Sequence, residues 1–145
     1  MASRNFTNLA DHIARARINF GADTFKALLV SSVPNETALD TWDYRNDVTG
    51  EITDADYTAG GFAVTASVAA VDAANDRVAV TFSCADPTYS AATLSAVGCI
   101  IYKSTGTDTT DPLVCFVDFG GTVASTNGDY TVTFDNPLYI NANPA

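Results

Sequence analysis

Length, composition and charge describe a single folded domain with an acidic body. The chain has 145 residues, of which 47% are hydrophobic and 17% are charged, so it can bury a core and is not expected to be disordered. Residues 1–26 carry four basic and two acidic side chains, whereas residues 27–145 carry three basic and fifteen acidic ones. Because so acidic a body repels phosphate backbones, we expect no nucleic acid partner.

The sequence contains neither a membrane span nor a recognisable leader. No stretch reaches the roughly 20 consecutive apolar residues that cross a bilayer. The segment after Met1 is polar and lacks the apolar centre of a signal peptide. We therefore expect synthesis in the cytoplasm of the producing cell and no membrane partner.

The first predicted element is a short helix over residues 5–17. Phe6, Leu9, Ala10 and Ile13 recur at spacings of three and four, which places them on one helical face. The only histidine, His12, is expected on the exposed surface of this helix. Residues 24–31 follow as a mostly apolar strand, which predicts burial on both of its faces.

Residues 32–61 form a long connection with little periodicity. Pro34-Asn35 is a turn signal, and an acidic stretch containing Trp42 and Tyr44 follows it. A loop of this length is unusual in a compact domain and is more often a functional or interface element than idle chain. Gly60-Gly61 ends the connection and indicates a sharp entry into the next strand.

Alternating apolar residues predict strands in the rest of the chain. Residues 62–68 and 78–82 read as one hairpin, and residues 97–103 and 113–119 read as another. Gly120-Gly121 is expected to end a strand, and Asn127-Gly128 is expected to form a tight turn. Further strands are predicted over residues 130–134 and, after Pro137, over residues 138–140.

Six or seven such strands without intervening helices predict a mainly β fold. We expect an antiparallel β-sandwich of jelly-roll type with a short N-terminal helix. Residues 1–23 are then a helical arm, and residues 24–145 are the β-sandwich domain.

The residues of an assembled catalytic site are missing from this pattern. With a single histidine, His-based triads and His-rich metal sites are nearly excluded, and no Gly-rich loop precedes a helix. We expect no enzyme activity and no cofactor. Cys84, Cys99 and Cys115 lie in apolar strands, where thiols act as small hydrophobic groups. Cys99 and Cys115 could face each other across a hairpin as a disulfide, but free thiols are the favoured alternative.

The pair Asp54 and Asp56 leaves two interpretations open. Carboxylates in this spacing can bind calcium, yet the later positions of the EF-hand pattern are not filled and a strand follows instead of a helix. A solvated acidic loop that leads into the strand is the favoured interpretation.

Four segments, taken in order, resemble a family of small virion proteins of tailed bacteriophages. They are FKALLVSSVPN at 25–35, DVTGEITDADYTAGGFAV at 47–64, AVGCIIYKSTGTDTTDPLVCFVDFG at 96–120 and NGDYTVTFD at 127–135. The resemblance implies a β-rich structural component of a phage particle. The leading interpretation is a capsid decoration (cement) protein on the outside of the shell, bound to the major capsid protein and to copies of itself. The alternative is a tail or connector component, or an appendage domain that recognises a host through loops such as 104–111.

Candidate contacts with a shell partner come from the helix and from the long connection. Buried aromatic residues and arginine are typical interface anchors. The candidates are Phe6, Leu9, Ile13, Arg15, Arg17, Trp42 and Tyr44. Two alternatives remain: Trp42 can plug a local core under its loop, and the helix face can cover one end of its own domain.

Overall fold

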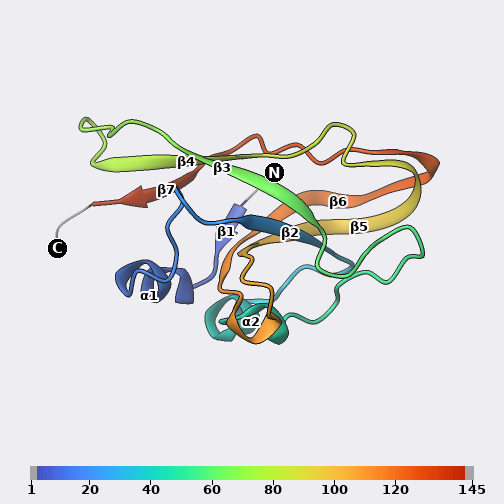
Figure 1. Ribbon diagram of the computed structural model, residues 1–145, viewed down its shortest axis with the longest axis horizontal. Helices are drawn as coiled ribbons and strands as arrows, with labels where there is room; N and C mark the ends of the chain where they lie inside the picture. The colour runs from blue at the N-terminus through green and yellow to red at the C-terminus, as the bar shows by residue number, and fades with distance from the viewer. Residues whose placement is uncertain (1–2, 143–145) are drawn as a thin grey trace.

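The computed structural model describes residues 3–142, and these form one antiparallel sheet of seven strands (Figure 1). The order across the sheet is β1-β6-β5-β2-β3-β4-β7, so β1 and β7 are its two outer strands. Two short helices, α1 (Asn8–Ala14) and α2 (Glu36–Thr41), and two 3-10 turns, η1 (Arg45–Asp47) and η2 (Asp108–Thr110), lie outside the sheet. The strands are β1 (Ser3–Asn5), β2 (Phe25–Val30), β3 (Phe62–Val68), β4 (Arg77–Ser83), β5 (Tyr89–Lys103), β6 (Leu113–Tyr130) and β7 (Leu138–Asn141).

The long pair β5–β6 forms the centre of the fold and makes the sheet curl. These strands are 15 and 18 residues long, and their pairing is interrupted by several register shifts. At one shift, residues 119–122 of β6 stand opposite Val97 alone, because Asp118 pairs with Gly98 and Val123 pairs with Ala96. A bulge of this kind bends a strand and increases its twist. Beyond this bulge the paired strands β5 and β6 bend sharply. The chain that follows β6 then runs back along the top of the view to β7 (Figure 1).

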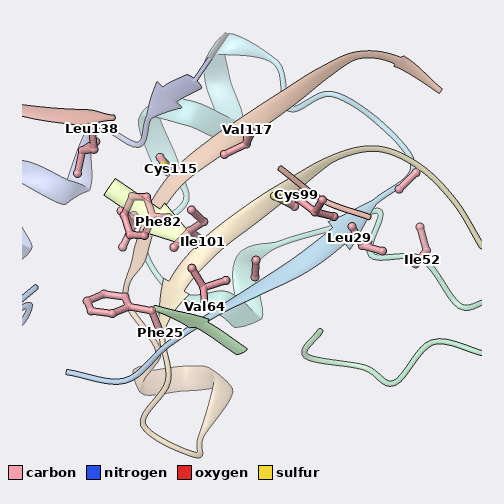
Figure 2. Close-up of a cluster of buried hydrophobic side chains, with 14 of the residues drawn as sticks. Phe25, Leu29, Ile52, Val64, Phe82, Cys99, Ile101, Cys115, Val117 and Leu138 are labelled. Carbon is pink, nitrogen blue, oxygen red and sulfur yellow. The ribbon is translucent and has the colours of Figure 1, made fainter. Parts of the chain in front are cut away.

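The curl encloses the larger of two apolar cores. Inner-face side chains of β2, β5 and β6 meet residues of β3, β4 and β7 there (Figure 2). The alternation of the strands supplies these inward positions, since every second side chain points to the same face. The labelled members in Figure 2 are Phe25, Leu29, Ile52, Val64, Phe82, Cys99, Ile101, Cys115, Val117 and Leu138.

The opposite face of β2, β5 and β6 carries a second, smaller core. Leu28, Ile100 and Phe116 point to this side and are covered by Leu39 of α2 and by Phe6. The prediction that the strand over residues 24–31 is buried on both faces is therefore confirmed. The long connection is the segment that covers this second face.

The N-terminal segment belongs to the same folded body. Leu9, Ile18 and Phe20 are buried in the larger core, and the backbone of Phe6 bonds to Val114 of β6. Side chains on both sides of the predicted boundary between an arm (1–23) and a β domain (24–145) therefore pack in one core. Residues 1–2 and 143–145 of these two predicted ranges lie outside the described residues.

The mainly β fold is confirmed, but the jelly-roll sandwich is not, because hydrogen bonds link all seven strands into one curled sheet. The predicted strand end at Gly120-Gly121 and the predicted tight turn at Asn127-Gly128 are wrong. Both dipeptides lie inside β6, where Gly120 (φ +79°) and Asn127 (φ +47°) supply the positive φ of bulges. Consequently β6 reaches Tyr130, and the strand predicted over residues 130–134 does not form separately.

Candidate functional site

An open apolar groove lies between α1, β1 and β7 and is the candidate binding site. It encloses about 490 Å³. Its ten described lining residues include none that is acidic, basic, histidine or cysteine, so its chemistry suits binding and not proton transfer. The lining residues are Asn5, Phe6, Thr7, Leu9, Ala10, Ile13, Ala14, Tyr139, Ile140 and Asn141.

The groove lies where the two outer strands of the curled sheet approach each other. β1 pairs only with β6, and β7 pairs only with β4, so each strand has one edge without a partner strand among residues 3–142. Unpaired strand edges present backbone N–H and C=O groups that an extended chain can bond. Tyr139 on β7 is 40% exposed beside this edge.

Three of the sequence-predicted contact residues, Phe6, Leu9 and Ile13, line this groove. Phe6 is only 1% exposed and Leu9 only 4%, because both side chains also pack into the cores of the chain itself. For these two residues the structure therefore matches the alternative in which the helix covers its own domain. Ile13 is half-buried and packs against the larger core.

Arg15 and Arg17 are not among the residues that line the groove. Both side chains bind the same carboxylate, that of Asp11. Asp11 accepts a hydrogen bond from Arg15 Nε at 2.7 Å and one from Arg17 Nη1 at 3.1 Å. The hydrogen bond from Arg15 holds the pKa of the Asp11 carboxyl below its usual range. All three side chains are exposed, so the basic helical end is locally neutralised by its own aspartate.

Trp42 and Tyr44 pack against the N-terminal segment from the long connection. The ring of Trp42 stacks on the ring of Phe6, with centroids 6.3 Å apart. Trp42 is partly buried and packs against the smaller core, as the alternative of a local plug predicts. Tyr44 lies 5.3 Å from the ring of His12. The seven candidate residues thus gather around α1, but on different sides of it.

The prediction that His12 lies on the exposed surface is wrong. Its side chain is 0% exposed, and its Nε2 atom is 2.7 Å from Asp43 Oδ1. The helix is shorter than predicted, and His12, three residues after Leu9 and next to it on the helix surface, is covered by Asp43 and Tyr44 of the long connection. His12 is a structural tether, and its Nδ1 atom has no hydrogen-bond partner within residues 3–142.

The carboxylates Asp54 and Asp56 bind backbone and fasten the loop to β5. Asp56 Oδ2 accepts the N–H of Thr93 at 2.8 Å, and Asp54 Oδ2 accepts the N–H of Ser95 at 3.1 Å. Thr93 lies in the register shift of β5–β6 between Ala92 and Leu94, and Ser95 is two residues further along β5. Among the described residues, no group of three or more His, Cys, Asp or Glu side chains is placed to hold a metal ion.

The rest of this loop is held by Glu51, Tyr57 and Tyr102. Glu51 Oε1 accepts the Tyr57 hydroxyl at 2.8 Å and the Gly60 N–H at 2.6 Å, and the Tyr102 hydroxyl donates to the Gly60 carbonyl at 2.6 Å. Burial raises the pKa of the Tyr102 phenol to about 12 and raises that of Tyr57 further. The predicted sharp entry into β3 is confirmed, since Gly60 and Gly61 both have positive φ.

A second polar cluster closes the tip between β5 and β6. The carboxylate of Asp111, 1% exposed, accepts from Arg45 Nε at 2.9 Å and from the backbone and hydroxyl of Thr105. Arg45 also lies over the ring of Tyr102, 5.3 Å from its centroid. These contacts connect the 104–111 loop to the long connection and give this end of the molecule a fixed shape.

The three cysteines are free thiols. Cys99 pairs with Val117, and Cys115 pairs with Ile101, so the two cysteines occupy adjacent strands but are not cross-strand partners. Burial raises the pKa of Cys115 to about 12 and that of Cys99 well above its ordinary value. The favoured free-thiol alternative is confirmed.

Sequence reasoning missed the half of the groove that β7 supplies. Tyr139 and Ile140 were predicted only as part of a short strand, with no binding role. The available signal was local: an exposed aromatic residue in a short terminal strand marks an edge. The sequence does not show that the curl of the sheet brings β7 beside α1.

No protein-family model, no curated protein and no solved structure matches the chain. Within residues 3–142, none of the helices has the length and apolar character needed to cross a membrane.

Proposed function

We propose that the chain is a structural protein of a tailed-bacteriophage virion, and specifically a capsid decoration protein on the outer surface of the shell. The observation that carries this proposal is the ordered set of four segments that resemble small phage virion proteins. An enzymatic role and a cofactor are not part of the proposal.

The positions of these segments in the fold support reading them together. Residues 25–35 contain β2, residues 47–64 contain the tethered loop and the start of β3, and residues 96–120 with 127–135 contain most of β5 and β6. In the sheet the corresponding strands are neighbours, in the order β6-β5-β2-β3. Segments that are separate in the sequence therefore form one continuous structural unit.

The proposed partners are the major capsid protein and other copies of this chain, with no nucleic acid and no membrane. The net charge of −10 favours the solubility of the protein and repels the phosphate groups of nucleic acids and membranes. A decoration protein binds the assembled shell more tightly than it binds free subunits. Such binding stabilises the particle by mass action, and the gain grows with the logarithm of the ratio of the free protein concentration to its dissociation constant.

The experiment is to localise and count the protein on purified virions. Gold-labelled antibody in electron microscopy and quantitative mass spectrometry are expected to give many copies distributed over the head. Particles assembled without the protein are expected to release their DNA at a lower temperature. A label confined to the tail or to an appendage would reject the decoration role in favour of the tail, connector or host-recognition alternative.

A further inference from the structure

Resting on the proposed virion role, we propose that the groove between α1, β1 and β7 binds an extended, basic segment of a neighbouring virion protein. The segment adds as a new strand along the free edge of β7. It thereby extends the seven-stranded sheet and ties the neighbour to this chain.

The register of β7 shows which backbone groups face the groove edge. The N–H of Ala142 donates to the carbonyl of Asp76 at 2.7 Å, and Ile140 is paired with Val78. Hydrogen-bonded pairs alternate along an antiparallel ladder, so the backbone groups of Tyr139 and Asn141 point away from β4. The free edge of β7 thus offers two N–H and two C=O groups in the spacing that an extended peptide matches.

On the other side of the opening, β1 also turns a strand edge toward the groove. The N–H of Phe6 donates to Val114, so the backbone groups of Asn5, one residue earlier, point away from β6. Asn5, Tyr139 and Asn141 all line the groove. The opening therefore lies between two strand edges that have no partner strand among residues 3–142, and it is not only a hollow between side chains.

The wall formed by α1 suits the side chains of an added strand. Leu9, Ala10, Ile13 and Ala14 face the groove, and the two alanines leave room beside the larger residues. Alternate side chains of a strand point to the same face, so every second residue of the segment would contact this wall. We therefore expect an alternating apolar segment.

Charge at the rim favours a basic segment. Asp40 accepts the hydroxyl of Thr7 at 2.7 Å at one side of the groove, and Asp76 lies beside Asn141 at the β7 side. Arg77 on β4 is already paired with Asp72 and lies over the Tyr139 ring at 3.8 Å, and Arg4 on β1 is already paired with Glu36. Together with the net charge of −10, these carboxylates attract lysine or arginine at the ends of the segment.

The test measures binding of a short synthetic peptide in which valine alternates with threonine and lysine stands at both ends. The full chain is titrated with the peptide, and amide exchange is followed residue by residue. The amides of Tyr139 and Asn141 are expected to become protected, whereas the amide of Ile140, already bonded to β4, serves as the internal reference. The same peptide with glutamate in place of lysine is expected to bind more weakly.

Variants separate backbone pairing from side-chain contact. Tyr139→Pro removes an N–H that points away from β4, a position where an edge strand tolerates proline. Tyr139→Thr removes the same ring but keeps the N–H and is the matched control. We expect Tyr139→Pro to bind about fivefold more weakly than Tyr139→Thr, the factor for one hydrogen bond. Ala10→Lys places a long, positively charged side chain on the apolar helix wall, where it repels the lysines of the peptide, and is also expected to weaken binding.

Several results would overturn the proposal. Equal affinity of the Tyr139→Pro and Tyr139→Thr variants would reject strand addition, as would binding without protection of the Tyr139 amide. Protection that rises with protein concentration in the absence of peptide would assign the edge to a second copy of this chain. No binding of any peptide would also reject it. These outcomes are independent of the virion count: a protein found on the head that fails the peptide test retains the decoration role without this mode of attachment.

Discussion

The Nε2 atom of His12 lies 2.7 Å from Oδ1 of Asp43, and this contact fixes α1 against the long connection. The histidine ring is fully buried and lies beside the ring of Tyr44. A residue that the helical pattern placed in solvent therefore joins two segments that are 31 positions apart in the sequence. The groove depends on this contact, because α1 forms one of its walls.

Replacement of His12 by alanine is expected to destabilise the protein. The substitution leaves a cavity and removes the partner of Asp43, which together should lower the free energy of unfolding by about 2 to 4 kcal/mol. Chemical denaturation followed by tryptophan fluorescence measures the change, since Trp42 lies in the same segment. Arg15→Ala on the exposed side of the same helix is the control and should have little effect. An equal loss in both variants would contradict the tether.

Gly61 is expected to tolerate no side chain. Its φ is +79°, and a Cβ atom there would lie 1.8 Å from the carbonyl oxygen of Ala27 on β2. Gly61→Ala must therefore displace β3 from β2, at a cost of about 3 kcal/mol or more. Gly106 has a similar φ, +91°, but open space around it. Gly106→Ala is the matched control and should cost about 1 kcal/mol, the strain of the left-handed backbone alone.

Asp54 and Asp56 are expected to stabilise the fold without binding calcium. Because their oxygens accept the N–H groups of Ser95 and Thr93, each substitution to alanine should cost about 1 kcal/mol. Thermal unfolding measures the loss, with Asp108→Ala in the exposed 104–111 loop as the control. Calcium and chelator should leave the melting temperature of the wild-type protein unchanged. A calcium-dependent rise that disappears in the Asp54 and Asp56 variants would contradict this assignment.

Strands with clear alternation were predictable from the sequence, and those containing glycine were not. The hairpin of β3 and β4 and the position of β2 follow directly from the spacing of apolar residues. Gly120-Gly121 and Asn127-Gly128 carry the local signature of a strand end and a turn. In the folded chain the pairing with β5 continues across both, because a bulge absorbs the positive φ while the flanking residues keep their partners.

The candidate site was predictable only in part, for a related reason. The apolar spacing of Phe6, Leu9 and Ile13 predicted a contact face, and all three line the groove, although Phe6 and Leu9 are also buried in the cores of the chain itself. Their contact with a partner stays a prediction. Tyr139 could not be predicted as a fourth member, because the sequence around it does not show that β7 is the outer strand of the sheet and lies beside α1. α2 was missed as well: it has only six residues, and its start at the Asn35 cap lies directly after the proline that indicated a turn.

The buried thiols are expected to react only after unfolding. Because burial raises the pKa of Cys115 to about 12 and that of Cys99 well above its ordinary value, neither forms the reactive thiolate near neutral pH. A thiol-reactive chromophore at pH 8 should modify these two cysteines in denaturant but not in the native protein. Cys84 is only partly buried and is expected to react first. Rapid modification of Cys115 in the native state, identified by mass spectrometry, would contradict the packing of the larger core.

Alkaline pH is expected to unfold the protein through its buried tyrosines. Burial raises the pKa values of Tyr89, Tyr102 and Tyr130 to about 12, above the value near 10 of an exposed phenol. A raised pKa in the folded state means that the native protein holds these protons more tightly than the unfolded chain. Stability is therefore complete below about pH 10 and is lost as the pH rises toward 12. Denaturant unfolding at pH 8, 10 and 11 should give a falling midpoint, and Tyr130→Phe should reduce the slope of that fall because one titrating group is removed. A midpoint that stays constant over this range, or a Tyr130→Phe variant with an unchanged slope, would show that these phenols are not held in the buried, protonated form.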